Sequence, residues 1–409
     1  MQPQVSDVCR VTTAALAFLL IATVTERSSV AQQPSSSSVT IRAARVLDGR
    51  GKTITNGVVE VQGTKIIAVD QRQGAVTIDL GDATLLPGMI DVHTHIDWHF
   101  QPNGLYGQRP GQPQETPEQR SAAIAANLKA TLEAGFTTVQ NVGNGGDKAL
   151  RDAIVAGKLV GPRILTSLGQ VQAGSRTNPT TPESLRERVR QLKANGADLI
   201  KIFASESIRT GGAPTMSQEQ LDAACDEAKK LGLRTLVHAH AAEAIVRVVK
   251  AGCTQVEHGA YASDEALKLM KDAGTYFDPN IGLVLQNYIE NKDKFMGSGS
   301  YDEAGFAFME KSVSVKGEMF KRALKSGVKM PLGTDAVAGA HGQNAREIIA
   351  RVQEGQAPMD GIISATSLAA ESMRLDKEIG TLAPNYEADI VAVSGNPLQD
   401  ITKLRSVVF

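Results

Sequence analysis

The chain has 409 residues, of which 42% are hydrophobic and 21% are charged, so it can bury one large domain together with a smaller one. Its formal net charge of −1 provides no basic field for nucleic acid, and it has no acidic tail that would indicate a macromolecular partner. A small-molecule substrate is therefore expected, and a homo-oligomer is left open.

The N-terminal segment is predicted to be an export signal. Arg10 precedes an apolar run over Ala14–Val24, and Ser29-Val30-Ala31 forms a small-x-small cleavage site. The run is about half of the roughly 20 residues that a membrane-spanning helix needs, so no stable membrane anchor is expected. Residues 1–31 would then be removed on export to the periplasm or the medium, with 32–38 as a linker. The alternative is a terminal helix that is buried or frayed.

After the linker, short β-rich runs broken by glycine predict a small β-sheet unit. The predicted strands are Val39–Val46, Val58–Val61, Lys65–Val69, Val76–Leu80 and Thr84–Leu86.

Beyond Gly88 the pattern changes to apolar strands that alternate with amphipathic helices, which predicts a parallel sheet. The predicted strands are Met89–Val92, Thr137–Asn141, Arg163–Thr166, Leu199–Ile202, Arg234–Val237, Gln255–Glu257, Thr275–Phe277 and Lys329–Leu332. The helices between them include Glu118–Glu133, Pro182–Asn195, Ser217–Leu231, which begins with a capping box, and Ala242–Ala251. Eight such units predict a (β/α)8 TIM barrel over residues 89–379, with its chemistry at the C-terminal ends of the strands.

The C-terminal part is expected to complete the small β-sheet unit. Two helices, Asn344–Glu354 and Met359–Leu368, lead to β-rich segments at Asp389–Val393 and Arg405–Phe409. The predicted organisation is therefore a small β-sandwich domain, formed by residues 39–88 and 380–409, beside the α/β barrel. The β-pattern continues to Phe409, so a further strand after this residue is expected.

Two cysteines remain once Cys9 has left with the signal. Cys225 and Cys253 do not form a C-x-x-C pair, and two cysteines are too few for a disulfide framework. We expect both to be small buried apolar groups.

The strongest functional signal is a set of metal-binding side chains at the ends of the predicted barrel strands. They are His93, His95, Lys201, His238, His258 and Asp335. Side chains alternate along a strand, so the His-x-His pair sends both rings to one face. Imidazole and carboxylate ligands suit zinc, manganese, iron or cobalt. Four histidines and an aspartate, all at strand ends, are poorly explained by structural roles.

Lys201 lies inside the apolar run Leu199–Phe203, where a buried ammonium would be costly. It could instead extend to the barrel mouth or pair with a carboxylate such as Glu206. Alternatively, a neutral amine could take up carbon dioxide, and the resulting carbamate could bridge two metal ions.

Several of these segments together resemble the amidohydrolase superfamily. They are Leu86–His95, Ile200-Lys201, Val237–His240, Glu257–Gly259 and Gly333–Ala336. More narrowly, the chain resembles the imidazolonepropionase-like branch, which contains metal-dependent Xaa-Pro dipeptidases (prolidases), carboxypeptidase-like enzymes and ochratoxin hydrolases. The resemblance extends over Val39–Phe409.

The resemblance implies a centre with two divalent metal ions, zinc first among the candidates. His93, His95 and Asp335 would bind the more buried ion. His238 and His258 would bind the more exposed ion, with carboxylated Lys201 as the bridge. A hydroxide between the ions would attack the amide, with Asp335 as general base and then general acid.

Five further residues are candidates for substrate binding. They are His240, His341, His99, Tyr261 and Arg209, all close to strand ends or on the loops that follow them. A structural role remains the alternative for each.

The predicted function is hydrolysis of an amide or peptide bond in a small substrate. That substrate would be an Xaa-Pro or other dipeptide, or an N-acyl amino acid, including ochratoxin-like amides. The alternatives are a cyclic-amide hydrolase of the imidazolonepropionase type and a non-catalytic binding barrel. Metal content would separate the last from the other two.

Overall fold

The computed structural model describes residues 38–409, apart from residues 110, 144 and 176. The predicted export signal and all but the last residue of the predicted linker lie outside the described residues. Ser38–Phe409 form one unit by their contacts. Within the described ranges no helix is long and apolar enough to cross a membrane.

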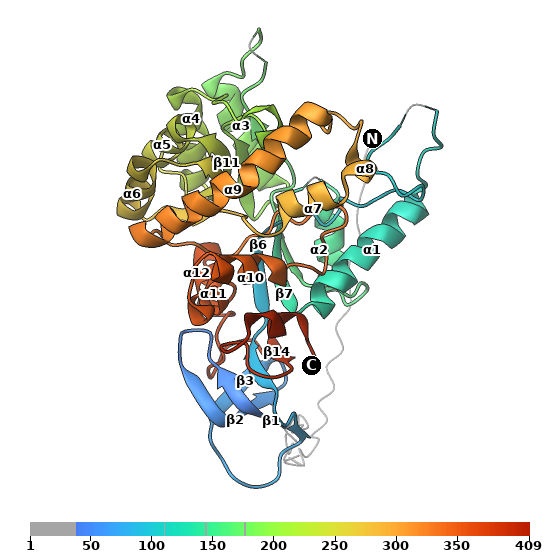
Figure 1. Cartoon of the computed structure of the whole chain (residues 1–409), viewed down its shortest axis with the longest axis vertical. Coiled ribbons are helices and arrows are strands. Elements are labelled where there is room, and N and C mark those ends of the chain that lie inside the picture. Colours follow the sequence, from blue (N-terminus) through green and yellow to red (C-terminus); the bar gives the residue numbers. More distant parts are fainter. Residues whose placement is uncertain (1–37, 110, 144, 176) are drawn as a thin grey trace, which may run out of the picture. The chain divides into compact units, whose positions relative to one another are not determined.

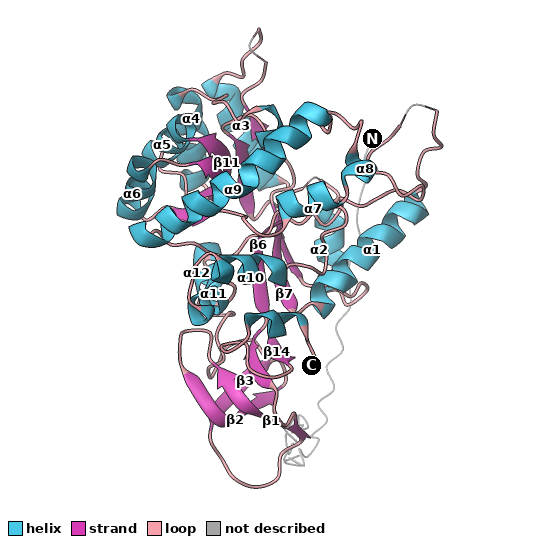
Figure 2. Ribbon diagram, in the orientation of Figure 1, coloured by secondary structure: helices cyan, strands magenta, loops and turns pink. Residues whose placement is uncertain are grey.

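The small sheet contains both ends of the described chain (Figures 1 and 2). Its strands are β1 (Val39–Leu47), β2 (Thr53–Gln62), β3 (Lys65–Asp70), β4 (Ile78–Asp79), β5 (Thr84–Pro87) and β14 (Ile390–Val393). Their order is β14-β5-β1-β2-β3, and β4 pairs with β1. The antiparallel pairing of β14 with β5 confirms that the C-terminal segment returns to this sheet.

The expected strand over Arg405–Phe409 is formed only in part. Its start is replaced by the short 3-10 helix η2 (Ile401–Arg405), which Asp400 caps by accepting a hydrogen bond from the Thr402 backbone N–H. Beyond η2 the chain runs beside β14: the backbone N–H of Val408 donates to the Ala392 carbonyl and that of Ala392 to the Phe409 carbonyl, both at 2.9 Å, and Val407 forms a bridge with Val393.

The barrel strands fall into two parallel sheets. One contains β6 (Met89–Thr94), β7 (Phe136–Asn141) and β8 (Arg163–Thr166). The other contains β9 (Gln170–Gln172), β10 (Leu199–Phe203), β11 (Arg234–Ala241), β12 (Gln255–Tyr261) and β13 (Tyr276–Asp278). The third predicted strand, Arg163–Thr166, is β8 and pairs with β7. The short strand β9 was not predicted, and it pairs with β10.

The eighth predicted strand, Lys329–Leu332, is extended chain without a regular ladder. It still lies between β13 and β6. The backbone N–H of Phe277 donates to the carbonyl of Lys329 at 2.9 Å, and that of Val92 donates to Leu332 at 2.8 Å. Pro331 interrupts the ladder because proline has no N–H to donate.

The helices surround the barrel strands. They are α1 (Pro117–Glu133), α2 (Asp147–Val155), α3 (Pro182–Ala194), α4 (Gln218–Lys230), α5 (Ala242–Lys250), α6 (Asp264–Ala273), α7 (Val284–Glu290), α8 (Lys292–Phe295), α9 (Glu303–Ser326), α10 (Ala345–Gln353), α11 (Pro358–Ser364) and α12 (Ser367–Met373), with the 3-10 turn η1 (Ile208–Thr210). The capping box predicted at Ser217 is present at the start of α4. The predicted helix Met359–Leu368 is broken into α11 and α12, because the Thr366 hydroxyl bonds back to the Ile362 carbonyl at the junction.

The sequence predicted two separate buried cysteines. In the structure they form a disulfide. Cys225 lies in α4 and Cys253 in the loop before β12, with a Cα–Cα distance of 5.2 Å. Both are buried within the same apolar cluster, which packs α4 and α5 against the strands. A separation of 28 residues with no motif gives no sign of this contact in the sequence.

Candidate functional site

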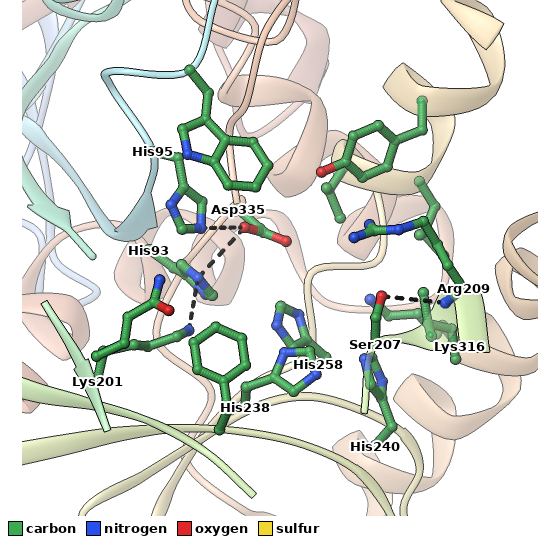
Figure 3. Close-up of a pocket in the computed structure, with 17 residues that line it drawn as sticks. His93, His95, Lys201, Ser207, Arg209, His238, His240, His258, Lys316 and Asp335 are labelled. Atoms are coloured by element: carbon green, nitrogen blue, oxygen red, sulfur yellow. Dashed lines mark hydrogen bonds and ion pairs between the residues drawn. The ribbon is translucent and has the colours of Figure 1, made fainter. Parts of the chain in front are cut away.

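A cavity opens where the C-terminal ends of the barrel strands meet. Its volume is about 880 Å³, counting the open mouth. All six predicted metal ligands line it. Figure 3 shows their side chains converging from different strands, together with Ser207, Arg209, His240 and Lys316.

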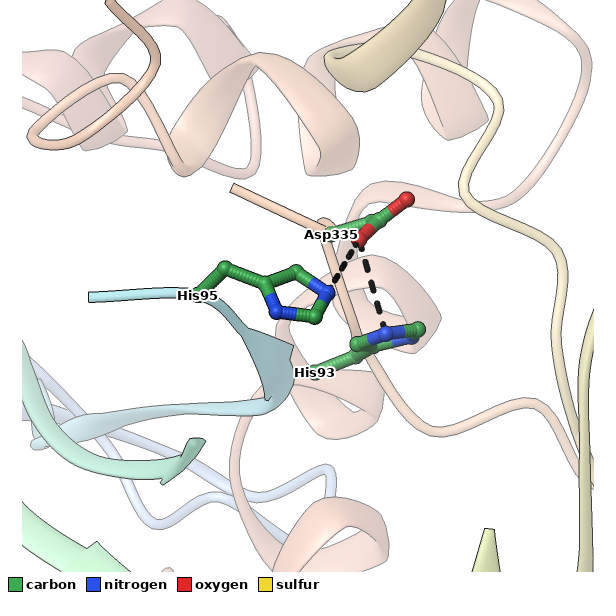
Figure 4. Close-up of side chains that lie close together, drawn as sticks. All are labelled: His93, His95 and Asp335. Carbon is green, nitrogen blue, oxygen red and sulfur yellow. Dashed lines mark ion pairs between the residues drawn. The ribbon is translucent and has the colours of Figure 1, made fainter. Parts of the chain in front are cut away.

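His93, His95 and Asp335 form one group of ligand atoms (Figure 4). The Asp335 Oδ1 atom lies 3.1 Å from Nε2 of His95 and 3.5 Å from Nε2 of His93. The two histidines occupy alternate positions of β6, and the backbone N–H of Asp335 donates to the His93 carbonyl at 2.8 Å. Burial by itself raises the pKa of Asp335, but His93, His95 and Lys201 outweigh it and lower this pKa below its usual value.

The surroundings of His93 favour a positive charge at this position. Its Nδ1 atom lies 2.7 Å from Oε2 of Glu257 and 3.8 Å from Oδ2 of Asp278. Burial and Lys201 lower the pKa of His93, but Asp335 and Glu257 raise it to about 9 overall. A metal ion at Nε2 would supply that charge, while Glu257 would fix the ring tautomer through Nδ1.

Lys201 is buried and lies close to the same histidine. It is 1% exposed, and its Nζ atom lies 3.1 Å from Nε2 of His93. Burial lowers the pKa of Lys201 from its ordinary value. Of the structural alternatives for this lysine, extension to the barrel mouth is wrong, and no ion pair with Glu206 forms among the described residues.

A second group of histidines faces the cavity from β11 and β12. The ring centroids of His238 and His258 are 4.7 Å apart, and those of His238 and His240 are 4.6 Å apart. Burial lowers the pKa of His238 to about 3 and the pKa values of His240 and His258 well below their usual value. The rings are therefore neutral at physiological pH, which is the form that binds metal.

Local backbone geometry positions these side chains. His258 and Asp335 have φ angles of +68° and +54°, a conformation that residues with a side chain rarely adopt and that is typical of functional sites. The strand β11 continues to Ala241, and both His238 and His240 line the cavity. Gly333 is required beside Asp335, because a Cβ atom there would lie 2.0 Å from Oδ2 of Asp278.

The five predicted substrate-binding residues separate into two groups. Arg209 and His240 line the cavity, whereas His341, His99 and Tyr261 do not. The Nε2 atom of His341 lies 3.1 Å from the Trp98 carbonyl oxygen, and Nε2 of His99 lies 2.6 Å from Oε1 of Glu115. Tyr261 packs against the apolar cluster under η1 and α7. His99 is held within its own loop, His341 by the loop after β6, and Tyr261 by an apolar cluster, so nothing in the cavity supports the substrate role predicted for them.

Other residues of the site were missed in the sequence. Lys316 on α9 is 2% exposed and lines the cavity, and its ammonium donates to the Asn280 carbonyl at 2.6 Å. Glu257 and Asp278 support His93, as described above. In the sequence, the position of Glu257 directly before the predicted ligand His258 is the one indication that this carboxylate lies at the site.

The donor set fits a metal centre. His93, His95 and Asp335 have ligand atoms within 4.8 Å of one another, and the second histidine pair and Lys201 line the same cavity. Nitrogen and oxygen donors of this kind suit zinc and its neighbours in the first transition series.

Comparisons with known proteins agree with this geometry. The model of the Amidohydrolase family matches residues 84–408. The chain is 27% identical over 354 residues to an ochratoxinase of Aspergillus niger, covering 78% of this chain and 71% of that protein. It is 23% identical over 387 residues to an imidazolonepropionase of Geobacillus kaustophilus, covering 83% and 84%.

This chain is similar along most of its length to a solved structure of a Xaa-Pro dipeptidase with methionine bound in the active site. The TM-score is 0.79 at 30% sequence identity, and the match covers 91% of this chain and 97% of that one. The likeness confirms the predicted fold class, a (β/α)8 barrel with a small β-sandwich. The chain therefore belongs to the amidohydrolase family and is a metal-dependent hydrolase that acts on amide bonds of small substrates.

Proposed function

We propose that the protein hydrolyses the amide bond of a dipeptide, with Xaa-Pro as the first candidate, or of an N-acyl amino acid, including ochratoxin-like amides. The observation that carries this proposal is the convergence of His93, His95, Lys201, His238, His258 and Asp335 on one cavity. The similar Xaa-Pro dipeptidase and ochratoxinase support the substrate class.

The site would hold two divalent ions, most simply zinc. His93, His95 and Asp335 would hold one, and His238 and His258 the other. Bound there, the ions would lower the pKa of a water molecule and polarise the amide carbonyl. Manganese, cobalt and iron accept the same donors.

Lys201 would bridge the two positions as a carbamate. Its buried amine loses a proton more readily than an exposed lysine, and the free lone pair can attack carbon dioxide. A nitrogen–carbon bond forms and a proton is released to solvent, which converts the amine into an anion with two oxygen donors. The nearby His93 ring makes this position suitable for a donor shared by both groups of histidines.

Asp335 would move the proton during hydrolysis. Its carboxylate stays ionised at neutral pH, so it can accept a proton from the attacking water. The same carboxyl group would then donate that proton to the leaving nitrogen. The cavity wall formed by Val284, Leu285 and Tyr288 would contact the apolar part of the substrate.

Two other functions remain as candidates. Hydrolysis of a cyclic amide is suggested by the similarity to imidazolonepropionase. A non-catalytic barrel is disfavoured because every predicted metal ligand is present at the cavity.

We also propose that the protein is exported, with residues 1–31 as its signal, 32–38 as its linker, and a domain boundary near residue 88. The Cys225–Cys253 disulfide supports an oxidising compartment, because cytosolic thiols are usually kept reduced. The N-terminal sequence of protein recovered from the periplasm or the medium tests this. A protein that retains Met1 and stays inside the cell would contradict it.

The decisive experiment measures metal content and activity together. The protein is expressed with zinc, manganese or cobalt and with bicarbonate, and is then screened against Xaa-Pro dipeptides, N-acyl amino acids and cyclic amides. We expect about two ions per chain, as in two-metal hydrolases, and turnover of the first two classes. Full metal content with turnover of cyclic amides alone would favour the second function, and metal-free protein that binds these compounds unchanged would favour the third.

A further inference from the structure

Two cations face the cavity without a carboxylate in direct contact. Arg209 and Lys316 line it, and in Figure 3 they extend into it from the side opposite His93 and Lys201. Neither has a carboxylate within 4.0 Å among the described residues. Charged side chains that are buried or half-buried usually have a partner, so this pair points to a ligand that carries negative charge.

Lys316 is held so that its ammonium enters the cavity. One N–H donates to the Asn280 carbonyl at 2.6 Å, and an ammonium has three. Asn280 is itself fixed, because its side-chain amide donates to Oδ2 of Asp278 at 2.7 Å and to the Gly333 carbonyl at 2.9 Å. Burial lowers the pKa of Lys316 to about 8, which leaves the ammonium as the main form at neutral pH.

Arg209 is also held in place with part of its guanidinium free. Its Nε atom donates to the Ser300 hydroxyl at 2.9 Å, and its guanidinium carbon lies 4.1 Å from the ring centroid of Tyr301. The two terminal NH2 groups have no hydrogen-bond partner among the described residues. A stacked guanidinium with a free fork matches the geometry of a carboxylate.

Both cations lie close to the group of histidines on β11 and β12. Both Arg209 and Lys316 act electrostatically on His240, and Lys316 acts also on His258. Glu347, Asp335 and Asp278 attract Lys316 over longer distances, but none of them forms an ion pair with it among the described residues. Metal ions at the histidines would repel both cations, and an anionic group of the substrate would offset that repulsion.

We propose that Arg209 and Lys316 bind the α-carboxylate of the amino acid that leaves when the amide is cleaved. This inference rests on the proposed function and narrows its substrates to dipeptides and N-acyl amino acids with a free C-terminal carboxylate. In such substrates one carbon atom separates the amide nitrogen from the carboxylate. That short connection agrees with cations placed beside the histidines of the metal centre.

The first test compares each acid with its carboxamide on the wild-type protein. The pairs are Ala-Pro with Ala-prolinamide, and N-acetyl-phenylalanine with its amide. We expect kcat/KM for the better acid to exceed that of its amide by at least about tenfold, the effect of one charged hydrogen bond. Equal values would overturn the carboxylate site and leave the proposed function intact.

The second test measures binding without turnover. Calorimetry compares L-proline and L-phenylalanine, the released amino acids, with their amides on metal-loaded protein. We expect the acids to bind at least about tenfold more tightly. The binding comparison tests the carboxylate site even if no compound in the screen is hydrolysed. A lack of turnover would count against the proposed function and not against the carboxylate site.

The third test assigns the effect to the two residues. Lys316→Met and Arg209→Met should each lower kcat/KM for the acid by roughly tenfold to hundredfold, mainly through KM, and should lower it much less for the amide. Retained turnover of the amide shows that the fold and the metal centre are intact. Lys311→Met, on the exposed face of the same helix α9, is the matched control and should change neither. Equal losses on acid and amide would mean a structural role and would overturn the assignment, and the wild-type comparisons stand even if a variant does not fold.

Discussion

The amine of Lys201 lies 3.1 Å from Nε2 of His93, a residue 108 positions earlier in the chain. The two side chains come from β10 and β6, which belong to different sheets of the barrel. Their contact places a buried amine between the two groups of histidines. An added carboxylate on this amine would therefore lie within the centre and not at its edge.

Replacing Lys201 by alanine should remove the second metal ion and the activity together, because the bridging oxygen donors are lost while the barrel remains. The measurement is metal content by elemental analysis, with hydrolysis rates of the best substrate from the screen. A short-chain carboxylic acid added to the buffer should restore part of both. Lys311→Ala is the control, and full activity in Lys201→Ala would show that no carbamate is needed.

The change Asp335→Asn separates metal binding from proton transfer. Asparagine keeps one oxygen donor but cannot accept a proton at neutral pH. If Asp335 moves the proton, kcat/KM should fall by roughly a hundredfold to ten-thousandfold at equal metal occupancy. Asp272→Asn, in an exposed pair with Lys268, is the control. A fully metallated variant with a near-normal rate would move the search for the base to His240, which shares the cavity.

Loss of the Cys225–Cys253 disulfide should destabilise the protein. The double change to serine removes a constraint on the unfolded chain, with an expected cost of about 2–4 kcal/mol in the free energy of unfolding. Urea unfolding of the wild type and the variant measures it. Thiol titration of unfolded protein that lacks residues 1–31, and therefore Cys9, checks whether the disulfide is present. Thiols that react fully before any reductant is added would show that the bond does not form.

Arg351 holds a buried group of charges behind the metal centre. Its side chain is fully buried and pairs with Oε1 of Glu347 at 2.9 Å and Oδ1 of Asp278 at 3.1 Å. Arg351→Met would remove the cation paired with Glu347 and would leave Asp278 beside His93 alone, which should cost about 3–5 kcal/mol of stability.

The control for Arg351 is Arg322→Met, which breaks a solvent-exposed pair with Asp264 and should cost at most about 1 kcal/mol. Both variants are compared with the wild type by urea unfolding. A loss in Arg351→Met no larger than in the control would mean that the carboxylates find other partners or take up protons. The same variant should also bind metal more weakly, because Asp278 lies beside Nδ1 of His93.

The sequence by itself was sufficient for the barrel and for the convergence of its candidate metal ligands. Strand and helix periodicities are local, and in a parallel barrel the C-terminal ends of all strands meet on one side. His93, His95, His238 and His258 each stand at such an end, so their convergence follows from the topology alone. The burial of Lys201 was likewise visible in its apolar strand.

Only the tertiary structure decided which other residues join the site, because their positions depend on contacts between distant segments. Lys316 has the sequence appearance of an ordinary helix lysine, yet the packing of α9 against η1 and β12 buries it at the cavity. His341 and His99 follow strands as the metal ligands do, but their rings contact the Trp98 carbonyl and the Glu115 carboxylate and do not line the cavity. The pairing of Cys225 with Cys253 likewise arises from the packing of α4 beside the loop before β12, since no local pattern encodes the distance between two sulfur atoms.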